Sequence, residues 1–237
     1  MPIREKLKRF WSGGPFWLVW LKRVAAAIVL WPLLSTVVYA LLPVPITNVM
    51  IFRLISGQGL HKSWTSMDNI SPLLSRAIIA SEDQRFCSHH GVDWTEFQDA
   101  VDNGLKAPSR GASTIPMQVA KNLYLWEGHS IIRKGLEMPL EIYMDTVLRK
   151  RRMMEIYLNI AEWAPGVYGA EAAAQHHFGK SAAHLSAREA ALLAASLPNP
   201  LKRNAGHPSV ALRLIAAHIQ NKMEAMGPYL ACLDQNP

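Results

Sequence analysis

The segment VAAAIVLWPLLSTVVYALL, residues 24–42, decides how this 237-residue chain is organised. It holds 19 consecutive residues without a charge. At 1.5 Å per residue, a helix of this length spans roughly 28 Å, which is close to the thickness of the hydrocarbon core of a bilayer. Pro32 is expected to kink the helix, and membrane-spanning helices tolerate such kinks. The segment therefore predicts a single membrane-spanning helix.

The residues before this segment predict its orientation. Residues 1–23 carry a net charge of +5 out of +7 for the whole chain. Basic residues before a span favour a cytoplasmic N-terminus, so residues 1–23 are expected in the cytoplasm and residues 43–237 outside it. Concentration of the charge on this tail argues against a nucleic-acid-binding surface. Aromatic residues on the same side are typical of an interfacial belt: Phe10, Trp11, Phe16, Trp17 and Trp20.

A cleaved signal peptide is the alternative to a retained anchor. Residues 38–40, Val-Tyr-Ala, resemble a cleavage site. The apolar stretch is longer than the usual 7–15 residues of such peptides, and its basic region is long. These two features favour the retained anchor.

The composition indicates an ordered chain, because 50% of its residues are apolar and 18% are charged. The two cysteines, Cys87 and Cys232, are too few for a disulfide framework or a structural zinc site. They can form one bridge or remain as free buried thiols, and the sequence leaves both open.

The part of the chain after the span predicts an all-α domain. Pro43 and Pro45 end the spanning helix, and residues 43–68 are expected to form a connector. We assign residues 69–237 to this domain. They show no period-two run and no hairpin pattern, which favours the all-α class. The expected helices begin at Ser71-Pro72, cover residues 138–158, begin at Ser186 with a capping box, and cover residues 209–226.

Two polar segments stand out against this helical background. Residues 77–94 read AIIASEDQRFCSHHGVDW, where Glu82 ends an apolar helix and could serve as a general base. A solvated helix terminus is the alternative. A metal site at His89, His90 and Asp93 is disfavoured, because adjacent histidines do not easily share one ligand face.

The second polar segment is residues 110–126, RGASTIPMQVAKNLYLW. Its hydroxyls Ser113 and Thr114 precede an apolar run, which suits a helix N-terminus that receives an anion. Lys121 could add a positive charge, and a plain capped helix is the alternative.

Three further segments are weak when taken singly. Residues 133–137 place two cations and one carboxylate on about one helical turn. Residues 150–159, KRRMMEIYLN, could simply pair Arg151 with Glu155 on a helix surface. Residues 166–180 are rich in small residues, and a packing motif is the favoured interpretation.

The order and spacing of these five segments resemble the five motifs of glycosyltransferase family 51, the peptidoglycan glycosyltransferases. The resemblance covers residues 72–204 and includes LPNPLKRN, residues 197–204. It is to the monofunctional members, without the transpeptidase domain of bifunctional penicillin-binding proteins. It implies a lysozyme-like α-helical domain in the periplasm, held on the bacterial inner membrane by the single span.

The resemblance also implies an inverting polymerase of lipid II, a disaccharide-pentapeptide on undecaprenyl pyrophosphate. The 4-hydroxyl of the acceptor attacks the anomeric carbon of the growing chain, and a β-1,4 bond replaces an α bond. Glu82 matches the catalytic base and Glu137 the second catalytic carboxylate. The residues expected at the substrate or its pyrophosphate are Asp83, Ser113, Thr114, Gln118, Lys121, Arg133, Lys134, Lys150, Glu155 and Asn159.

The expected partners are lipid II, the growing glycan chain and the membrane, with divisome or penicillin-binding proteins as further candidates and no nucleic acid. No cofactor is required and no metal-ligand set is visible. The resemblance allows a divalent cation, Mg²⁺ or Mn²⁺, that assists departure of the pyrophosphate.

The chain departs from the family pattern at Met117, where a glutamine is common, and at His129, where an arginine is common. By the resemblance, residues 94–109, between Asp93 and Arg110, occupy the place of the family's membrane-associated jaw. An apolar face there could comprise Trp94, Phe97, Val101 and Leu105, with a core-facing helix as the alternative.

Two other functions compete with polymerisation. A lytic transglycosylase would also use one glutamate, but it has no use for the clustered cations. A membrane-anchored scaffold would explain the anchor but not five ordered motifs.

Overall fold

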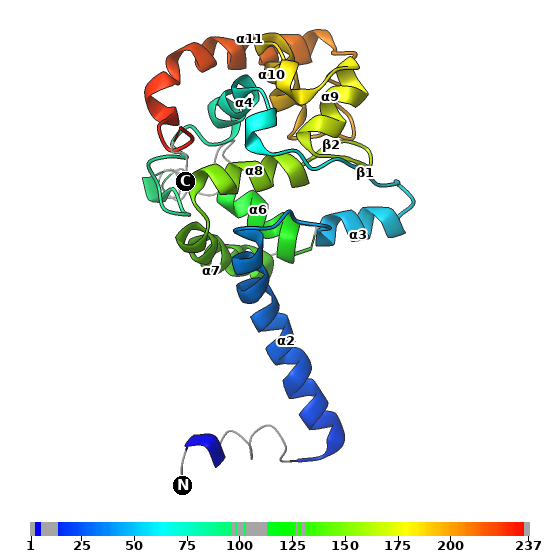
Figure 1. Cartoon of the computed structure of the whole chain (residues 1–237), viewed down its shortest axis with the longest axis vertical. Helices are drawn as coiled ribbons and strands as arrows, with labels where there is room; N and C mark the ends of the chain where they lie inside the picture. The colour runs from blue at the N-terminus through cyan, green and yellow to red at the C-terminus, as the bar shows by residue number, and fades with distance from the viewer. Residues whose placement is uncertain are drawn as a thin grey trace.

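The computed structural model describes residues 3–5, 14–95, 98, 102, 113–126, 128 and 131–234. A long helix, α2 (Phe16–Tyr39), extends away from a helical domain (Figure 1). The helix begins before the charge-free segment and contains Pro32. Among the described residues, α2 is the one helix long and apolar enough to cross a membrane.

The C-terminal third of α2 is attached to the domain by hydrogen bonds. Tyr143 Oη donates to the carbonyl of Leu33 at 2.7 Å. The hydroxyl of Tyr124 lies 3.0 Å from Ser35 Oγ and 2.8 Å from Thr36 Oγ1. Ser35 and Thr36 are buried, so this part of α2 belongs to the packing of the domain.

The domain is mainly helical, as the sequence predicts. The central helix α8 has α4, α10 and α11 on one side and α6 and α7 on the side toward α2 (Figure 1). The helices are α3 (Asn48–Ile55), α4 (Pro72–Glu82), α6 (Ile115–Tyr124), α7 (Ile131–Val147), α8 (Lys150–Ile160), α9 (Ala170–Phe178), α10 (Ala187–Ser196) and α11 (Val210–Ala225), with short 3₁₀ turns η1 (Met67–Asn69), η2 (Ala182–His184) and η3 (Gly227–Leu230).

The helix starts follow the expected local chemistry. Ser71 precedes Pro72, which occupies the first turn of α4. Ser186 and Glu189 form the predicted capping box at α10. Ser209 caps α11 by accepting from the amide of Leu212 at 3.2 Å. Each cap satisfies an amide that has no partner within its helix.

The core surrounds α8. Residues 156–160 and Met153 and Met154 of this helix are buried. They belong to one apolar cluster with Ile78 of α4, Val119 of α6 and Leu193 of α10. The cluster therefore fixes the ends of α4 and α6 relative to each other, and these two ends carry the candidate site.

The prediction of one helix over residues 138–158 is wrong. The structure has two helices, since α7 ends at Val147 and α8 begins at Lys150. Arg149 has an extended backbone with ψ 149°. Leu148 and Met154 are both buried, so the apolar pattern continues across the break. For this reason the break is not visible in the sequence.

The structure also contains a small three-stranded sheet, which the sequence analysis did not predict. Short strands β1 (His61–Lys62), β3 (Val167–Tyr168) and β2 (Glu162–Ala164) form a sheet in that order, with β1 parallel and β2 antiparallel to β3. Gly169 follows β3 with φ +93°, and a Cβ there would lie 2.6 Å from the carbonyl oxygen of Ser63. This close approach agrees with a packing role for the small residues of 166–180.

A disulfide resolves the alternative for the cysteines. Cys87, in the loop after α4, is bonded to Cys232 near the C-terminus, with 5.5 Å between their Cα atoms. The bridge holds the C-terminal segment against the loop that follows Glu82.

Candidate active site

A cavity of about 460 Å³ lies between the end of α4, the start of α6, and helices α10 and α11. Four predicted site residues line it: Glu82, Asp83, Ser113 and Gln118. The other lining residues are Ala80, Ser81, Gln84, Ala194, Ala195, Pro198, Arg203, Ile215, His218, Ile219 and Lys222.

Glu82 is the last residue of α4 and presents its carboxylate to this cavity. Gln118 Nε2 donates to Glu82 Oε2 at 3.0 Å, and Ser81 Oγ lies 3.5 Å from Oε1. Burial raises the pKa of the Glu82 carboxyl, while the Gln118 amide and the charge of Arg203 oppose that rise. A carboxylate that holds a proton more tightly than usual is suited to general-base catalysis.

Tyr157 fixes the orientation of Gln118. Its hydroxyl donates to Gln118 Oε1 at 3.1 Å, which leaves the amide nitrogen directed at Glu82. Tyr157 is buried in α8, and burial raises its pKa well above the usual value. The sequence analysis assigned no role to this residue, although a buried tyrosine hydroxyl usually requires a hydrogen-bond partner.

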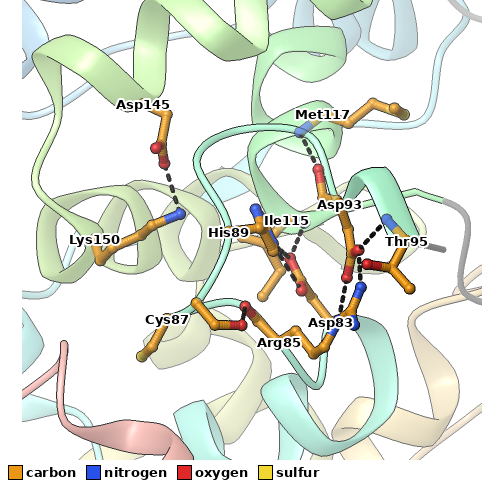
Figure 2. A network of polar contacts seen from close by, with 12 residues as sticks. Asp83, Arg85, Cys87, His89, Asp93, Thr95, Ile115, Met117, Asp145 and Lys150 are labelled. Carbon is orange, nitrogen blue, oxygen red and sulfur yellow. Dashed lines mark hydrogen bonds and ion pairs between the residues drawn. The ribbon is translucent and has the colours of Figure 1, made fainter. Parts of the chain in front are cut away.

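Asp83 uses its carboxylate within the protein (Figure 2). His89 Nε2 lies 3.0 Å from both carboxylate oxygens, and the amide of Ile115 donates to Oδ2 at 2.9 Å. Asp83 therefore ties the loop after α4 to the first turn of α6. This arrangement positions Glu82, at the end of α4, and Gln118, near the start of α6.

The histidines near Asp83 do not gather into a metal centre. His89 pairs with Asp83, whereas Asp93 accepts from Arg85 Nε at 2.7 Å (Figure 2). His90 is exposed and lies 3.5 Å from Asp145. Over the part of the chain that the structure describes, no group of three or more His, Cys, Asp or Glu residues could hold a metal ion.

Thr114 is the N-cap of α6. Its hydroxyl accepts from the amide of Met117 at 3.2 Å and donates to Glu141 Oε2 at 3.3 Å. The structure therefore gives Thr114 the role of a helix cap, which the sequence analysis named as the alternative to anion binding. Burial raises the pKa of Glu141 to about 7. Met117, where the family commonly has a glutamine, lies half-buried in the first turn of α6.

Arg133 and Glu137 form a buried ion pair on α7. Arg133 Nε also donates to the carbonyl of Gly128 at 2.9 Å. Lys134 is exposed next to them, and Lys121 is half-exposed on α6. The described residues that line the cavity do not include Lys121, Lys134, Arg133 or Glu137.

Lys150 lies at the start of α8 and pairs with Asp145. Its Nζ is 2.7 Å from Asp145 Oδ1 (Figure 2). The same Nζ lies 4.9 Å from the ring centroid of Phe86. Phe86 is fully buried. These contacts hold the first turn of α8 against the loop after α4.

The last two predicted residues, Glu155 and Asn159, bind backbone. Glu155 Oε2 accepts from the amide of Met67 at 3.2 Å, and Oε1 pairs with Arg152. Asn159 exchanges two hydrogen bonds with the backbone of Thr65, at 2.7 and 2.8 Å. Both side chains therefore attach the segment around residues 65–67 to α8.

The sequence analysis missed one wall of the cavity. Arg203, His218 and Lys222 line it from the α10–α11 side. Arg203 also donates to the carbonyl of Ala195 at 2.7 Å. His218 and Lys222 are one helical turn apart on α11, far along the chain from the polar motifs, so no local pattern connected them with Glu82.

Some expectations fall outside the described residues. They are His129 and three of the apolar positions expected in the jaw, Phe97, Val101 and Leu105. The fourth, Trp94, is 57% exposed.

Comparison with known proteins identifies the family of this chain. The family model described as "Transglycosylase" matches residues 48–224. The chain belongs to this transglycosylase family, as the ordered motifs predict.

Curated relatives have a more specific name, "Biosynthetic peptidoglycan transglycosylase". The relative from Agrobacterium fabrum is 52% identical over 209 residues, which cover 87% of this chain and 92% of the relative. The relative from Rhizobium johnstonii is 48% identical over 218 residues, covering 90% and 89%. The one from Rhizobium etli is 48% identical over 238 residues, covering 98% and 99%.

Proposed function

We propose that this transglycosylase polymerises glycan strands of the cell wall from lipid II, with Glu82 as the general base. The observation that carries the proposal is the position of Glu82. Its carboxylate lines a cavity, has a pKa raised by burial, and is fixed through Gln118 by the buried Tyr157.

The reaction requires one base. The 4-hydroxyl of the acceptor sugar loses its proton as its oxygen attacks the anomeric carbon, and Glu82 takes that proton. The bond from the anomeric carbon to the pyrophosphate breaks with its electron pair on the phosphate oxygen. Attack from the opposite face converts an α linkage into a β-1,4 linkage.

The leaving pyrophosphate needs positive charge rather than a proton. Cations can stabilise the charge that develops on phosphate oxygens, so no second acid of the glycosidase type is required. Lys121 and Lys134 are the exposed or half-exposed cations of the family motifs on α6 and α7. Glu137, neutralised by Arg133, would act by fixing that guanidinium rather than by transferring a proton.

A divalent cation, Mg²⁺ or Mn²⁺, is compatible with this chemistry. The described residues offer no set of three metal ligands, so the phosphate oxygens of the substrate would supply most of its ligands. The cation would then screen the charge of the leaving group.

We further propose that α2 is a retained membrane anchor with its N-terminus in the cytoplasm and the domain in the periplasm. Its contact with Tyr143 at Leu33 supports retention, since cleavage after Ala40 would remove this packed segment. Arg23 and Leu33 are ten residues apart, which is roughly 15 Å of helix against about 30 Å of hydrocarbon. The side of the domain at α7 would therefore lie against the outer leaflet, where the lipid-linked substrate is also held.

The test uses full-length protein in detergent with fluorescently labelled lipid II. Wild type should produce glycan ladders, and Glu82→Gln should produce none. Glu224→Gln is the matched control, because Glu224 is an exposed carboxylate of α11 that does not line the cavity. Cleavage of finished glycan with lipid II left intact would replace polymerisation by the lytic function. Glycan ladders from Glu82→Gln equal to those of wild type would refute Glu82 as the base. Wild type that neither consumes lipid II nor cuts glycan would leave the scaffold function.

A further inference from the structure

Helix α3 (Asn48–Ile55) carries apolar residues on two opposite faces. Val49 and Met50 are buried in the domain. Ile51, Phe52 and Ile55 are spaced so that they share one face of the helix, and all three are exposed, Ile55 by 80%. A surface helix usually presents polar side chains on its outer face, so the apolar outer face of α3 indicates a contact beyond the domain.

The outer face of α3 carries no charged side chain. Arg53 is the one charged residue in the sequence of this helix, and its Nε lies 3.5 Å from Glu162 Oε2 of β2, on the side of the domain. A charged group is costly to bring into contact with lipid, because it loses its hydration. The outer face of α3 avoids this cost, so it is compatible with a membrane surface.

The distance of α3 from the bilayer follows from the length of α2. About 20 residues of helix cross a hydrocarbon core of roughly 30 Å, so a span that enters after Arg23 leaves the hydrocarbon near Pro43. Arg152 Nε donates to the carbonyl of Tyr39 at 2.8 Å, which holds the end of the span against the start of α8. Helix α3 begins at Asn48, and the short connector before it keeps the helix near the lipid headgroups.

The direction of α3 suits a helix that lies in the membrane interface. Figure 1 shows α3 running across the direction of α2, on the side of the domain from which α2 extends. Interfacial helices lie in the plane of the membrane and bury their apolar face about 5–10 Å into the boundary between headgroups and acyl chains. Leu41 and Leu42 are also exposed, so apolar surface continues from the span through the connector to α3. This continuity favours lipid over a protein partner as the occupant of the outer face.

We propose that Ile51, Phe52 and Ile55 insert into the outer leaflet of the membrane that α2 spans. The inference rests on the retained anchor of the proposed function, and it concerns a segment that precedes the five family motifs. A second contact beside the span prevents the domain from turning about α2. It holds the cavity with Glu82 at a constant height above the bilayer that carries the lipid-linked substrate.

The experiment places a spin label on α3 of the full chain in lipid nanodiscs of phosphatidylethanolamine and phosphatidylglycerol. The disulfide uses both native cysteines, so the cysteine of Phe52→Cys or Ile55→Cys is the one thiol that reacts with the label. Electron paramagnetic resonance then measures collisions of the label with oxygen, which concentrates in lipid, and with a water-soluble nickel chelate. Leu214→Cys is the matched control, because Leu214 is an exposed apolar residue of α11, a helix remote from α2 (Figure 1). Val29→Cys in α2 is the reference for lipid contact.

We expect the ratio of oxygen to nickel collisions at Phe52→Cys and Ile55→Cys to be severalfold higher than at Leu214→Cys and to approach that at Val29→Cys. A ratio equal to that at Leu214→Cys would overturn the membrane contact. Few collisions with either reagent would overturn it in favour of a protein surface, such as a second copy of the chain.

The same measurements separate this inference from the proposals on which it rests. A label at Val29→Cys that nickel reaches as readily as at Leu214→Cys would refute the anchor, and the inference with it. Labels on α3 that are shielded as expected, in a protein that leaves lipid II unused, would refute the polymerase and leave the membrane contact in place.

Discussion

Replacing Gln118 by leucine should lower the ionised fraction of the catalytic base, Glu82, in a way that a pH profile can measure. Gln118 donates a hydrogen bond to Glu82 Oε2 at 3.0 Å, and this bond lowers the pKa of a carboxyl that burial otherwise raises. The bond stabilises the ionised form. Its loss should therefore raise the pKa of Glu82 further and move the acidic limb of kcat/KM to higher pH.

The expected size follows from the kind of bond that is lost. A hydrogen bond to a charged group contributes about 1.5–3 kcal/mol, and the lower end applies because the cavity is open to water on one side. Since 1.36 kcal/mol corresponds to one pKa unit, Gln118→Leu should move the acidic limb by about one pH unit and lower kcat/KM by up to about tenfold on that limb. The loss should be larger at acidic pH and smaller at alkaline pH.

Tyr157→Phe should produce a smaller effect of the same sign. The hydroxyl that holds Gln118 Oε1 at 3.1 Å disappears, but the amide remains. A neutral hydrogen bond contributes about 0.5–1.5 kcal/mol, so the loss should be roughly two- to tenfold. Tyr143→Phe is the control, because it removes an equivalent hydroxyl that binds Leu33 of α2, away from the cavity.

The assay follows consumption of labelled lipid II by each purified variant over a range of pH. A Gln118→Leu profile whose acidic limb coincides with that of wild type, or lies at lower pH, would refute the reasoning. A limb displaced equally in Tyr143→Phe would show that detergent or folding, rather than the contact with Glu82, sets the profile.

Three further predictions concern stability, each measured as the melting temperature of the full chain in detergent. Burial raises the pKa of Glu141 from its ordinary 4.5 to about 7 in the folded protein. The folded state therefore binds this proton more tightly, and the free energy of unfolding falls as pH rises between these values. Glu141→Gln should therefore stabilise the protein at pH 8 by up to about 3 kcal/mol and have little effect at pH 4, and equal shifts at both would contradict this. The double variant Cys87→Ser, Cys232→Ser removes a disulfide that joins residues 145 positions apart, and it should lower the free energy of unfolding by about 5 kcal/mol. An unchanged melting temperature would exclude such a contribution. Asn159→Ala removes both contacts to Thr65 and should lower stability by about 2 kcal/mol while folded enzyme stays active; loss of activity at an unchanged melting temperature would contradict a structural role.

The sequence was sufficient for the helical class and for several helix starts. Ser186 and Glu189 are three residues apart, so their capping box could be read locally. The ordered motifs also predicted the family. Local patterns did not disclose the break at Arg149, because the helices on both sides bury their apolar faces in one core. Strands of two or three residues are too short for a period-two pattern.

The walls of the site required the fold. Glu82 and Gln118 belong to separate motifs, and their contact depends on the packing of α4, α6 and α8. His218 and Lys222 lie on α11, which the sequence predicted as a helix without any functional pattern. Sequence order gives no measure of such proximity, because the packing of distant helices decides it.

The motif residues differ in whether their polar atoms are already hydrogen-bonded within the protein or remain available to a substrate. Asn159 uses its amide oxygen and nitrogen on backbone, and Asp83 uses both oxygens on His89 and Ile115. Gln118 likewise accepts from one side chain and donates to another, so we expect it to act on the base and not on the sugar. Glu82 differs, since Gln118 occupies Oε2 while Oε1 has the long 3.5 Å contact with Ser81. Oε1 is therefore the oxygen that we expect to take the proton of the acceptor hydroxyl.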